Sequence, residues 1–194
     1  MMEKGDYLTA IIRSNKTIFS ISDVALLWQE SNLNAIRVRL NYYARNGDLH
    51  RIRKNFYAKD TKYDRLELAN RLFSPSFISF ETALARYGMI FQYSTVISMA
   101  AYLTRQVKIE GQDYSYRRIK ESALLAPIGL DIRESYTLAG KERAFLDTLY
   151  ISPGFHFDNL RELDWDKVLE ILPIYQNKRL EKEVGNLRQL DQLE

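Results

Sequence analysis

The spacing of hydrophobic residues predicts three helices near the start of the chain, over residues 2–14, 20–28 and 33–46. In the first and third segments, apolar side chains recur three and four positions apart, which gathers them on one face of a helix. Ser20 followed by Asp23 is a pair that starts helices, and Asn32 or Asn34 can cap the third segment. Gly47 ends that segment, because glycine tolerates the left-handed conformation that follows a helix.

The third segment has an apolar side and a polar side. Its apolar residues fall on one side of the helix and are Leu33, Ile36, Leu40 and Tyr43. Its polar residues fall on the opposite side and are Asn34, Arg37, Asn41 and Arg45, with Arg39 near the boundary. A helix patterned in this way packs its apolar side on the core and exposes its polar side.

A short hairpin follows the third helix. Two strand-like runs lie within residues 49–58, and Lys54-Asn55 between them is a candidate tight turn. The predicted order is therefore helix, helix, helix and hairpin, with a short connection between the second and third helices. This order is typical of the winged helix-turn-helix, in which the last helix enters the DNA major groove and the hairpin reaches the backbone or the minor groove.

The pattern changes after residue 60. A helical segment over residues 60–73 ends before Ser74-Pro75, because proline disfavours a helical conformation in the residue before it. The remaining predicted elements are a helix at 80–88 capped by Ser79, strands over 94–101, 103–109, 114–119 and across 129–138, and helices over 140–150, 165–172 and 178–193. Separate runs of strands and helices favour an α+β fold.

These patterns divide the chain into three parts. We predict a winged-helix domain at residues 1–59, a helical connector at 60–76, and an α+β domain at 77–194 with a largely antiparallel sheet and packed helices. The last predicted helix carries leucine and valine at helical spacing, and these side chains pack either on the second domain or against a partner.

The amino-acid composition excludes several kinds of functional site. The 194 residues include no cysteine, which excludes a disulfide framework, cysteine-ligated zinc, iron–sulfur clusters and a thiol nucleophile. The eight glycines form no phosphate-binding loop and the two histidines form no metal-binding pair, so we predict no cofactor. The apolar runs are far shorter than the ~20 residues that a bilayer requires. The N-terminus lacks a signal-peptide core, so we expect a cytoplasmic protein without membrane contact.

Basic residues are concentrated in the first part of the chain. Residues 1–73 hold 13 Lys and Arg against 8 Asp and Glu, whereas residues 74–194 hold 15 against 17. The net charge of +3 therefore combines +5 with −2. The sharpest block is Leu33–Lys59, with seven bases against one acid, Asp48. A local excess of this kind is typical of a surface that faces phosphates.

The third helix and the hairpin carry side chains suited to DNA. We predict that double-stranded DNA is contacted by Asn34, Arg37, Arg39, Asn41, Arg45, Arg51, Arg53 and Lys54. Arginine and asparagine on the helix can hydrogen-bond guanine and adenine edges, and the cations of the hairpin suit phosphates. The alternative is a winged helix that binds protein and whose exposed helix is merely polar.

Three of the acids of the second half are candidates for chemistry, namely Glu81, Glu142 and Asp147. One interpretation makes them metal-binding carboxylates of a nuclease or nucleotidyltransferase. The favoured interpretation is structural, because Glu81 and Glu142 fall in the first turns of predicted helices, where an acid complements the helix dipole. Asp147 is five positions after Glu142, so the two side chains do not lie on the same face of the helix. The Asp147 carboxylate can instead pair with Lys141 or Arg143 or accept a hydrogen bond from a strand backbone. We therefore predict no catalytic residue, no metal ligand and no enzyme.

Three segments carry a resemblance to a known family: Ile78–Met89, Tyr114–Lys120 and Thr137–Tyr150. Their residues, order and spacing resemble those of the AbiEi-type antitoxins of bacterial type IV toxin–antitoxin systems. These systems act in abortive phage infection. The resemblance covers about Tyr7 to Tyr150. It implies an N-terminal DNA-binding winged helix and a C-terminal domain that counters a nucleotidyltransferase-like toxin. It further implies a transcriptional autorepressor that binds operator inverted repeats upstream of its own operon, as a homodimer on DNA.

Overall fold

The protein has a mixed α+β fold, as the sequence predicts. The computed structural model describes residues 6–92 and 94–191. The chain divides into two compact units, residues 1–68 and 69–194, and the division falls inside helix α4 (Arg65–Leu72). Helix α4 begins five residues later than the hydrophobic pattern suggests, because the Asp64 carboxylate accepts the Leu66 amide at 2.8 Å and caps the helix there.

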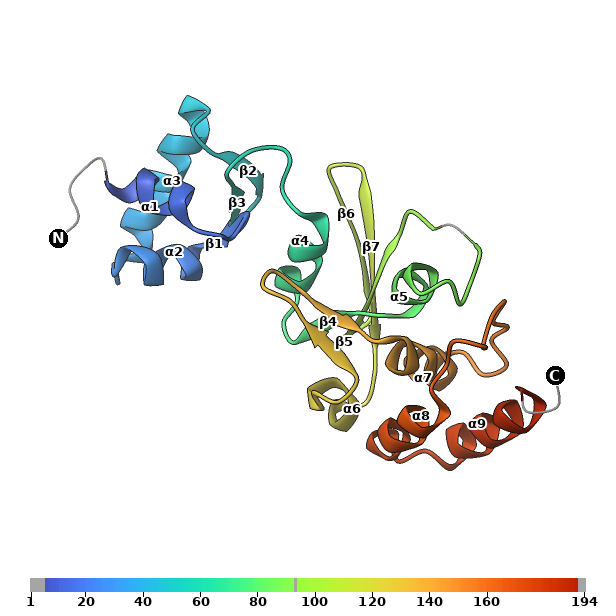
Figure 1. Cartoon of the computed structure of the whole chain (residues 1–194). Helices are drawn as coiled ribbons and strands as arrows, with labels where there is room; N and C mark the ends of the chain where they lie inside the picture. The colour runs from blue at the N-terminus through green and yellow to red at the C-terminus, as the bar shows by residue number, and fades with distance from the viewer. Residues whose placement is uncertain (1–5, 93, 192–194) are drawn as a thin grey trace. The chain divides into compact units, whose positions relative to one another are not determined.

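The described part of the N-terminal unit combines helices with a three-stranded antiparallel sheet (Figure 1). Its elements in chain order are α1 (Asp6–Arg13), β1 (Ile18–Ser20), α2 (Ile21–Trp28), α3 (Leu33–Asn46), β2 (His50–Arg53) and β3 (Phe56–Ala58). Strand β3 lies in the middle and pairs with both β1 and β2. The predicted helices and hairpin are confirmed, except that the predicted first helix also covers residues 2–5, which lie outside the described residues.

Two predicted helix caps are present with their expected hydrogen bonds. The Ser20 hydroxyl accepts the Asp23 amide at 3.1 Å, and the Asp23 carboxylate accepts the Ser20 amide at 2.9 Å, which forms a capping box before α2. The Asn32 side chain accepts two amides at the start of α3, each at 3.1 Å. Gly47 ends α3 with a φ of 82°, the left-handed conformation expected of it.

The capping box supports a stability prediction. Replacing Ser20 with alanine removes the acceptor for the Asp23 amide and is expected to lower the free energy of unfolding by about 1 kcal/mol. Urea denaturation followed by circular dichroism measures this loss. The exposed Ser31 supplies the matched control, and Ser31→Ala is expected to stay within about 0.5 kcal/mol of the parent protein. Equal stability of the two variants would contradict the cap assignment.

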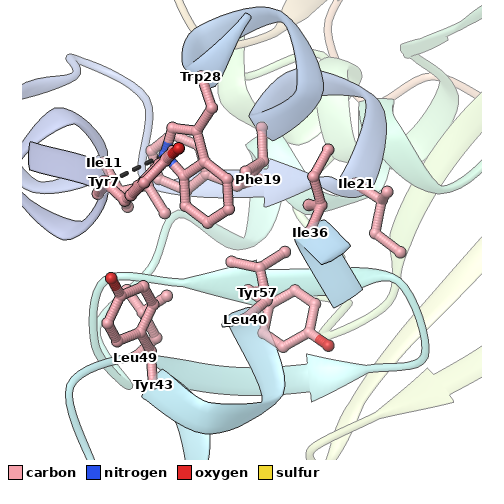
Figure 2. Close-up of a cluster of buried hydrophobic side chains, with 11 residues drawn as sticks. Tyr7, Ile11, Phe19, Ile21, Trp28, Ile36, Leu40, Tyr43, Leu49 and Tyr57 are labelled. Carbon is pink, nitrogen blue, oxygen red and sulfur yellow. Dashed lines mark hydrogen bonds between the residues drawn. The ribbon is translucent and has the colours of Figure 1, made fainter. Parts of the chain in front are cut away.

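The core of the N-terminal unit forms around Trp28 (Figure 2). The Trp28 indole packs edge-on against Tyr7 with ring centroids 4.9 Å apart, and its Nε1 donates to the Tyr7 carbonyl at 2.9 Å. Helix α3 contributes Ile36 and Leu40, which are fully buried. The prediction that Leu33 lies on the buried side is wrong, since its side chain is 44% exposed. Leu33 is the first residue of α3 and lies beyond the part of the helix that the core covers.

The C-terminal unit is built on a six-stranded sheet (Figure 1). After α4 its elements in chain order are β4 (Ser76–Ile78), α5 (Phe80–Arg86), β5 (Ile97–Ala101), β6 (Arg105–Ile109), β7 (Gln112–Arg118), α6 (Glu121–Leu125), β8 (Leu130–Ile132), β9 (Thr137–Ala139), α7 (Lys141–Ile151), α8 (Trp165–Ile171), the 3₁₀ helix η1 (Leu172–Tyr175) and α9 (Lys178–Asp191). Residues 192 and 193 of the predicted last helix lie outside the described residues.

The sheet of the C-terminal unit is mixed, with strand order β6-β7-β5-β4-β9-β8. Three of its pairings are antiparallel, and the pairs β5–β7 and β4–β9 are parallel. The sheet is therefore mostly antiparallel, as predicted, but its two parallel pairings were not expected. Alternation of apolar and polar residues indicates a strand but not the direction in which it pairs, and β4, only three residues long, was not predicted at all.

Helix α7 forms the centre of the C-terminal unit and packs against α5, α8 and α9. Ala144, Phe145, Leu146 and Leu149 are fully buried along it. The predicted capping role of Ser79 is wrong, because the Ser79 side chain makes no cap hydrogen bond to α5. Its hydroxyl instead donates to Asp147 Oδ2 on α7 at 2.7 Å. Within the described ranges, none of the helices has the length and apolar character needed to cross a bilayer.

Candidate nucleic-acid interface

The side of α3 opposite the N-terminal core is exposed and mostly polar. Asn34, Arg37 and Arg45 are exposed on it, and Asn41 is half-buried. The Arg37 guanidinium donates from Nη1 to Asn34 Oδ1 at 3.0 Å. This hydrogen bond joins residues one turn apart and holds Arg37 along the helix surface. An arginine held this way keeps further N–H donors for a ligand.

Asn41 connects α3 to the sheet of the N-terminal unit. The buried Tyr57 of β3 donates its hydroxyl to Asn41 Oδ1 at 3.0 Å. One acceptor position of the Asn41 amide is therefore occupied inside the unit. The second lone pair and the NH₂ group remain for a ligand. Asn41 thus fixes the position of α3 on β3 and can also present its amide to a base.

Arg39 lies against the aromatic pair of the core. Its guanidinium carbon is 3.8 Å from the centroid of the Tyr7 ring and 5.6 Å from the Trp28 ring. A cation placed over an aromatic face is attracted by the ring quadrupole. The side chain is half-buried. We infer that Arg39 stabilises the packing of α3 on α1, and that its charge is directed at the rings rather than at a phosphate.

The hairpin of β2 and β3 follows α3 after the turn at Gly47 (Figure 1). Its sequence carries three exposed cations. Arg51 and Arg53 are exposed on β2 and flank Ile52, which is buried. Lys54 is exposed in the turn, where Asn55 adopts a φ of 69°. Asparagine is one of the few residues that tolerate this left-handed conformation. A bulge between Arg51 and Arg53 changes the register against β3 and bends this strand.

This surface of α3 and the hairpin carries mostly positive charge. Asp48 is the one acid between residues 33 and 59, and it is exposed in the turn between α3 and β2. Lys59, the last base of the block, donates its ammonium to the Ser14 carbonyl. The exposed cations of this surface are Arg37, Arg45, Arg51, Arg53 and Lys54. Five cations near a single acid produce a positive potential that attracts a polyanion.

Two exposed residues of α3 were not predicted as part of the interface. Val38 is 70% exposed and Tyr42 is 59% exposed. They lie four residues apart, beside Arg37 and Asn41 on the exposed side of the helix. Their spacing from Asn34 in the sequence places them on this side. Their residue types gave no such signal, because valine and tyrosine are more often core residues.

The carboxylate of Asp147 in the C-terminal unit is buried and surrounded by hydrogen-bond donors. Its carboxylate accepts the Tyr175 hydroxyl at 2.6 Å and the Ser79 hydroxyl at 2.7 Å, and Arg143 Nε lies 3.4 Å from Oδ1. Burial raises the pKa of the Asp147 carboxyl, although Arg143 and both hydroxyls oppose the rise. Burial and the neighbouring Asp147 also raise the pKa of Tyr175 well above its ordinary value, which keeps its hydroxyl a donor.

The other two acids of the predicted motifs have separate partners. Glu81 lies in the first turn of α5 and forms an ion pair with Arg117 at 2.8 Å. Glu142 lies in the first turn of α7, where its carboxylate accepts the Asp164 amide at 3.3 Å. Both first-turn positions agree with the prediction. Among residues 6–92 and 94–191, no three His, Asp or Glu side chains are grouped as a metal site would require.

The C-terminal unit also contains a cleft of about 530 Å³. The loops after α5 and α7 and the end of α9 form its walls. The lining residues include Phe91, Phe155, Phe157, Arg161, Leu187 and Leu190. Phe91 is 74% exposed and Leu190 is 61% exposed. The apolar residues of α9 are therefore divided: Leu180 and Val184 are buried in the unit, whereas Leu190 faces the cleft.

Comparisons with known proteins add little to this geometry. No family model matches the chain. Nor does any curated protein match it. Among solved structures, the chain is similar to the RV2827C protein from Mycobacterium tuberculosis, with a TM-score of 0.47 and 15% sequence identity over 92% of this chain and 69% of that chain. A likeness at this level assigns no function.

Proposed function

We propose that the N-terminal unit is a winged helix-turn-helix that binds double-stranded DNA. One observation carries the proposal: an exposed, basic side of α3 is followed directly by a hairpin with three exposed cations. The order of helices and hairpin is that of the winged motif. Positive charge is concentrated on the surface that this motif presents to a duplex, where Asp48 is the one opposing acid between residues 33 and 59.

The two parts of the surface take different roles in the proposed complex. Helix α3 lies in the major groove, where Arg37 and Arg45 can each donate two hydrogen bonds to guanine O6 and N7. Asn34 supports Arg37 through their 3.0 Å hydrogen bond. The hairpin lies on the DNA backbone, where the cations of Arg51, Arg53 and Lys54 neutralise phosphates and release counterions.

The biological role that we propose is that of a cytoplasmic transcriptional autorepressor and antitoxin. This part rests on the resemblance to AbiEi-type antitoxins, which also suggests a homodimer on inverted repeats and a nucleotidyltransferase-like toxin as partner. Expression of the adjacent reading frame with and without this protein tests the antitoxin role. Growth arrest that co-expression relieves supports it, and growth arrest that persists contradicts it without affecting the proposal of DNA binding.

A second candidate function is a protein-binding adaptor. The side chain that a protein partner would cover is Leu26 of α2, which is 81% exposed. A single exposed leucine is common on protein surfaces, so this observation is weaker support than the basic surface of α3 and the hairpin. Retention of the adjacent gene product on the immobilised protein, together with no mobility shift of any duplex, supports the adaptor. A duplex shift that depends on the cations of α3 and the hairpin supports the DNA-binding protein instead.

The hairpin gives a quantitative prediction. Arg53→Ala is expected to weaken binding about equally on all duplexes and to make the slope of log K against log salt less negative by about 0.9, the effect of one phosphate contact. Fluorescence anisotropy at several salt concentrations measures the slope. Arg161→Ala removes the same charge from an exposed position of the C-terminal unit and is expected to leave the slope unchanged. Equal slopes for both variants would contradict the role of the hairpin.

A further inference from the structure

An apolar side chain lies in the middle of the polar side of α3. Val38 is 70% exposed, next to Arg37 and one turn after Asn34. Ile36 and Leu40 of the same helix are fully buried and fill the core below. Val38 therefore lies outside the buried core and presents most of its surface to solvent. Its exposure leaves a hydrophobic surface free for a ligand.

The neighbours of Val38 indicate what kind of ligand this is. Arg37 and Arg45 are exposed on the same side of α3, and the half-buried Asn41 is one turn away. A protein partner that covered Val38 would have to satisfy or desolvate these arginines. The major groove of DNA offers them guanine acceptors and also offers an apolar group, the C5-methyl of thymine. The charge of this surface thus favours a duplex.

The shape of valine suits such a contact. A β-branched side chain in a helix has one strongly preferred χ1 rotamer, so the two methyl groups of Val38 are held at a fixed place on the helix surface. Ordering this side chain on binding costs little conformational entropy. Cytosine carries no methyl group at C5, so a rigid methyl contact distinguishes thymine from cytosine at one position.

We infer that Val38 contacts the C5-methyl group of a thymine in the major groove and selects thymine at that position of the binding site. The inference rests on the proposed DNA binding. The inference adds a base preference to that proposal. It assigns this preference to Val38, whose apolar side chain can neither hydrogen-bond a base nor pair with a phosphate.

Replacement of thymine by deoxyuridine tests the contact, because it removes the methyl group and nothing else. Duplexes are first selected from a random pool with the full-length protein, and each thymine of the best duplex is then replaced singly. We expect one thymine per half-site at which deoxyuridine weakens binding about threefold to tenfold. Val38→Ala should weaken binding to the thymine duplex by a similar factor and should no longer respond to deoxyuridine there.

Control variants keep the test specific. Ile132→Ala truncates an equally exposed β-branched residue, 72% exposed on β8 of the C-terminal unit, and is expected to respond to deoxyuridine as the parent does. Val38→Ile keeps the methyl groups and is expected to keep the response. If Val38→Ala and the parent show the same deoxyuridine profile, the inference is overturned while DNA binding stands. If the parent protein selects no duplex, the proposed function and the inference both fail.

Discussion

Replacing Arg143 with methionine is expected to lower the free energy of unfolding of the C-terminal unit by about 3–5 kcal/mol, because it leaves a buried carboxylate without its cation. Both Arg143 and Asp147 are fully buried. Arg143 also donates to the carbonyl of Ile128 at 2.8 Å and to that of Ala123. Methionine fills a similar length but supplies none of these donors. Urea denaturation followed by circular dichroism measures the loss.

A matched pair on the surface serves as the control for this prediction. Arg133 forms an ion pair with Asp131 at 2.7 Å, and both side chains are more than a third exposed. Arg133→Met is expected to cost far less than Arg143→Met, because solvent screens an exposed ion pair. The double variant Arg143→Met/Asp147→Leu should recover part of the loss, because it leaves no unpaired charge. Stability of Arg143→Met close to that of Arg133→Met would contradict the role assigned to the buried pair.

The second large effect is expected on DNA recognition. Replacing both Arg37 and Arg45 with alanine should weaken binding to the selected duplex by about 2–6 kcal/mol, since each arginine–guanine contact is worth about 1–3 kcal/mol. Binding to unrelated duplexes should weaken much less, because the cations of the hairpin are retained. Anisotropy titrations against both kinds of duplex give the ratio of the two affinities.

The control for the double variant has the same change in charge. Arg118 and Arg161 are exposed in the C-terminal unit, and their double replacement with alanine also removes two positive charges. We expect this variant to keep the preference for the selected duplex. A similar loss of preference in both double variants would show that overall charge, rather than the exposed side of α3, determines recognition.

Local signals predicted the N-terminal unit well. The capping box of Ser20 and Asp23, the cap at Asn32 and the stop at Gly47 lie within a few residues of the helix ends they define. Hydrogen bonds of this kind depend only on nearby sequence. The three-residue strands β1 and β4 were missed, because such short segments show no alternation and form only by pairing with strands distant in sequence.

The contacts of the candidate site and the buried pair were predictable only in part. The sequence places Arg37 and Arg45 on the exposed side of α3, because helical periodicity is a local property. It does not reveal that Arg39 stacks on Tyr7, which comes from another helix. Likewise, Asp147 receives the hydroxyl of Ser79 from 68 positions away. Such contacts depend on tertiary packing, which no local spacing encodes.

DNA binding by the N-terminal unit is the central claim, and titration of a labelled duplex with the full-length protein tests it most directly. The duplex is one selected from a random pool or taken from the region upstream of the gene, and salt is varied between about 50 and 200 mM. We expect a shift at submicromolar protein with a slope of log K against log salt of about −3, from the three hairpin cations. No shift at about 10 µM protein and about 50 mM salt, where even non-specific binding is measurable, would contradict the claim.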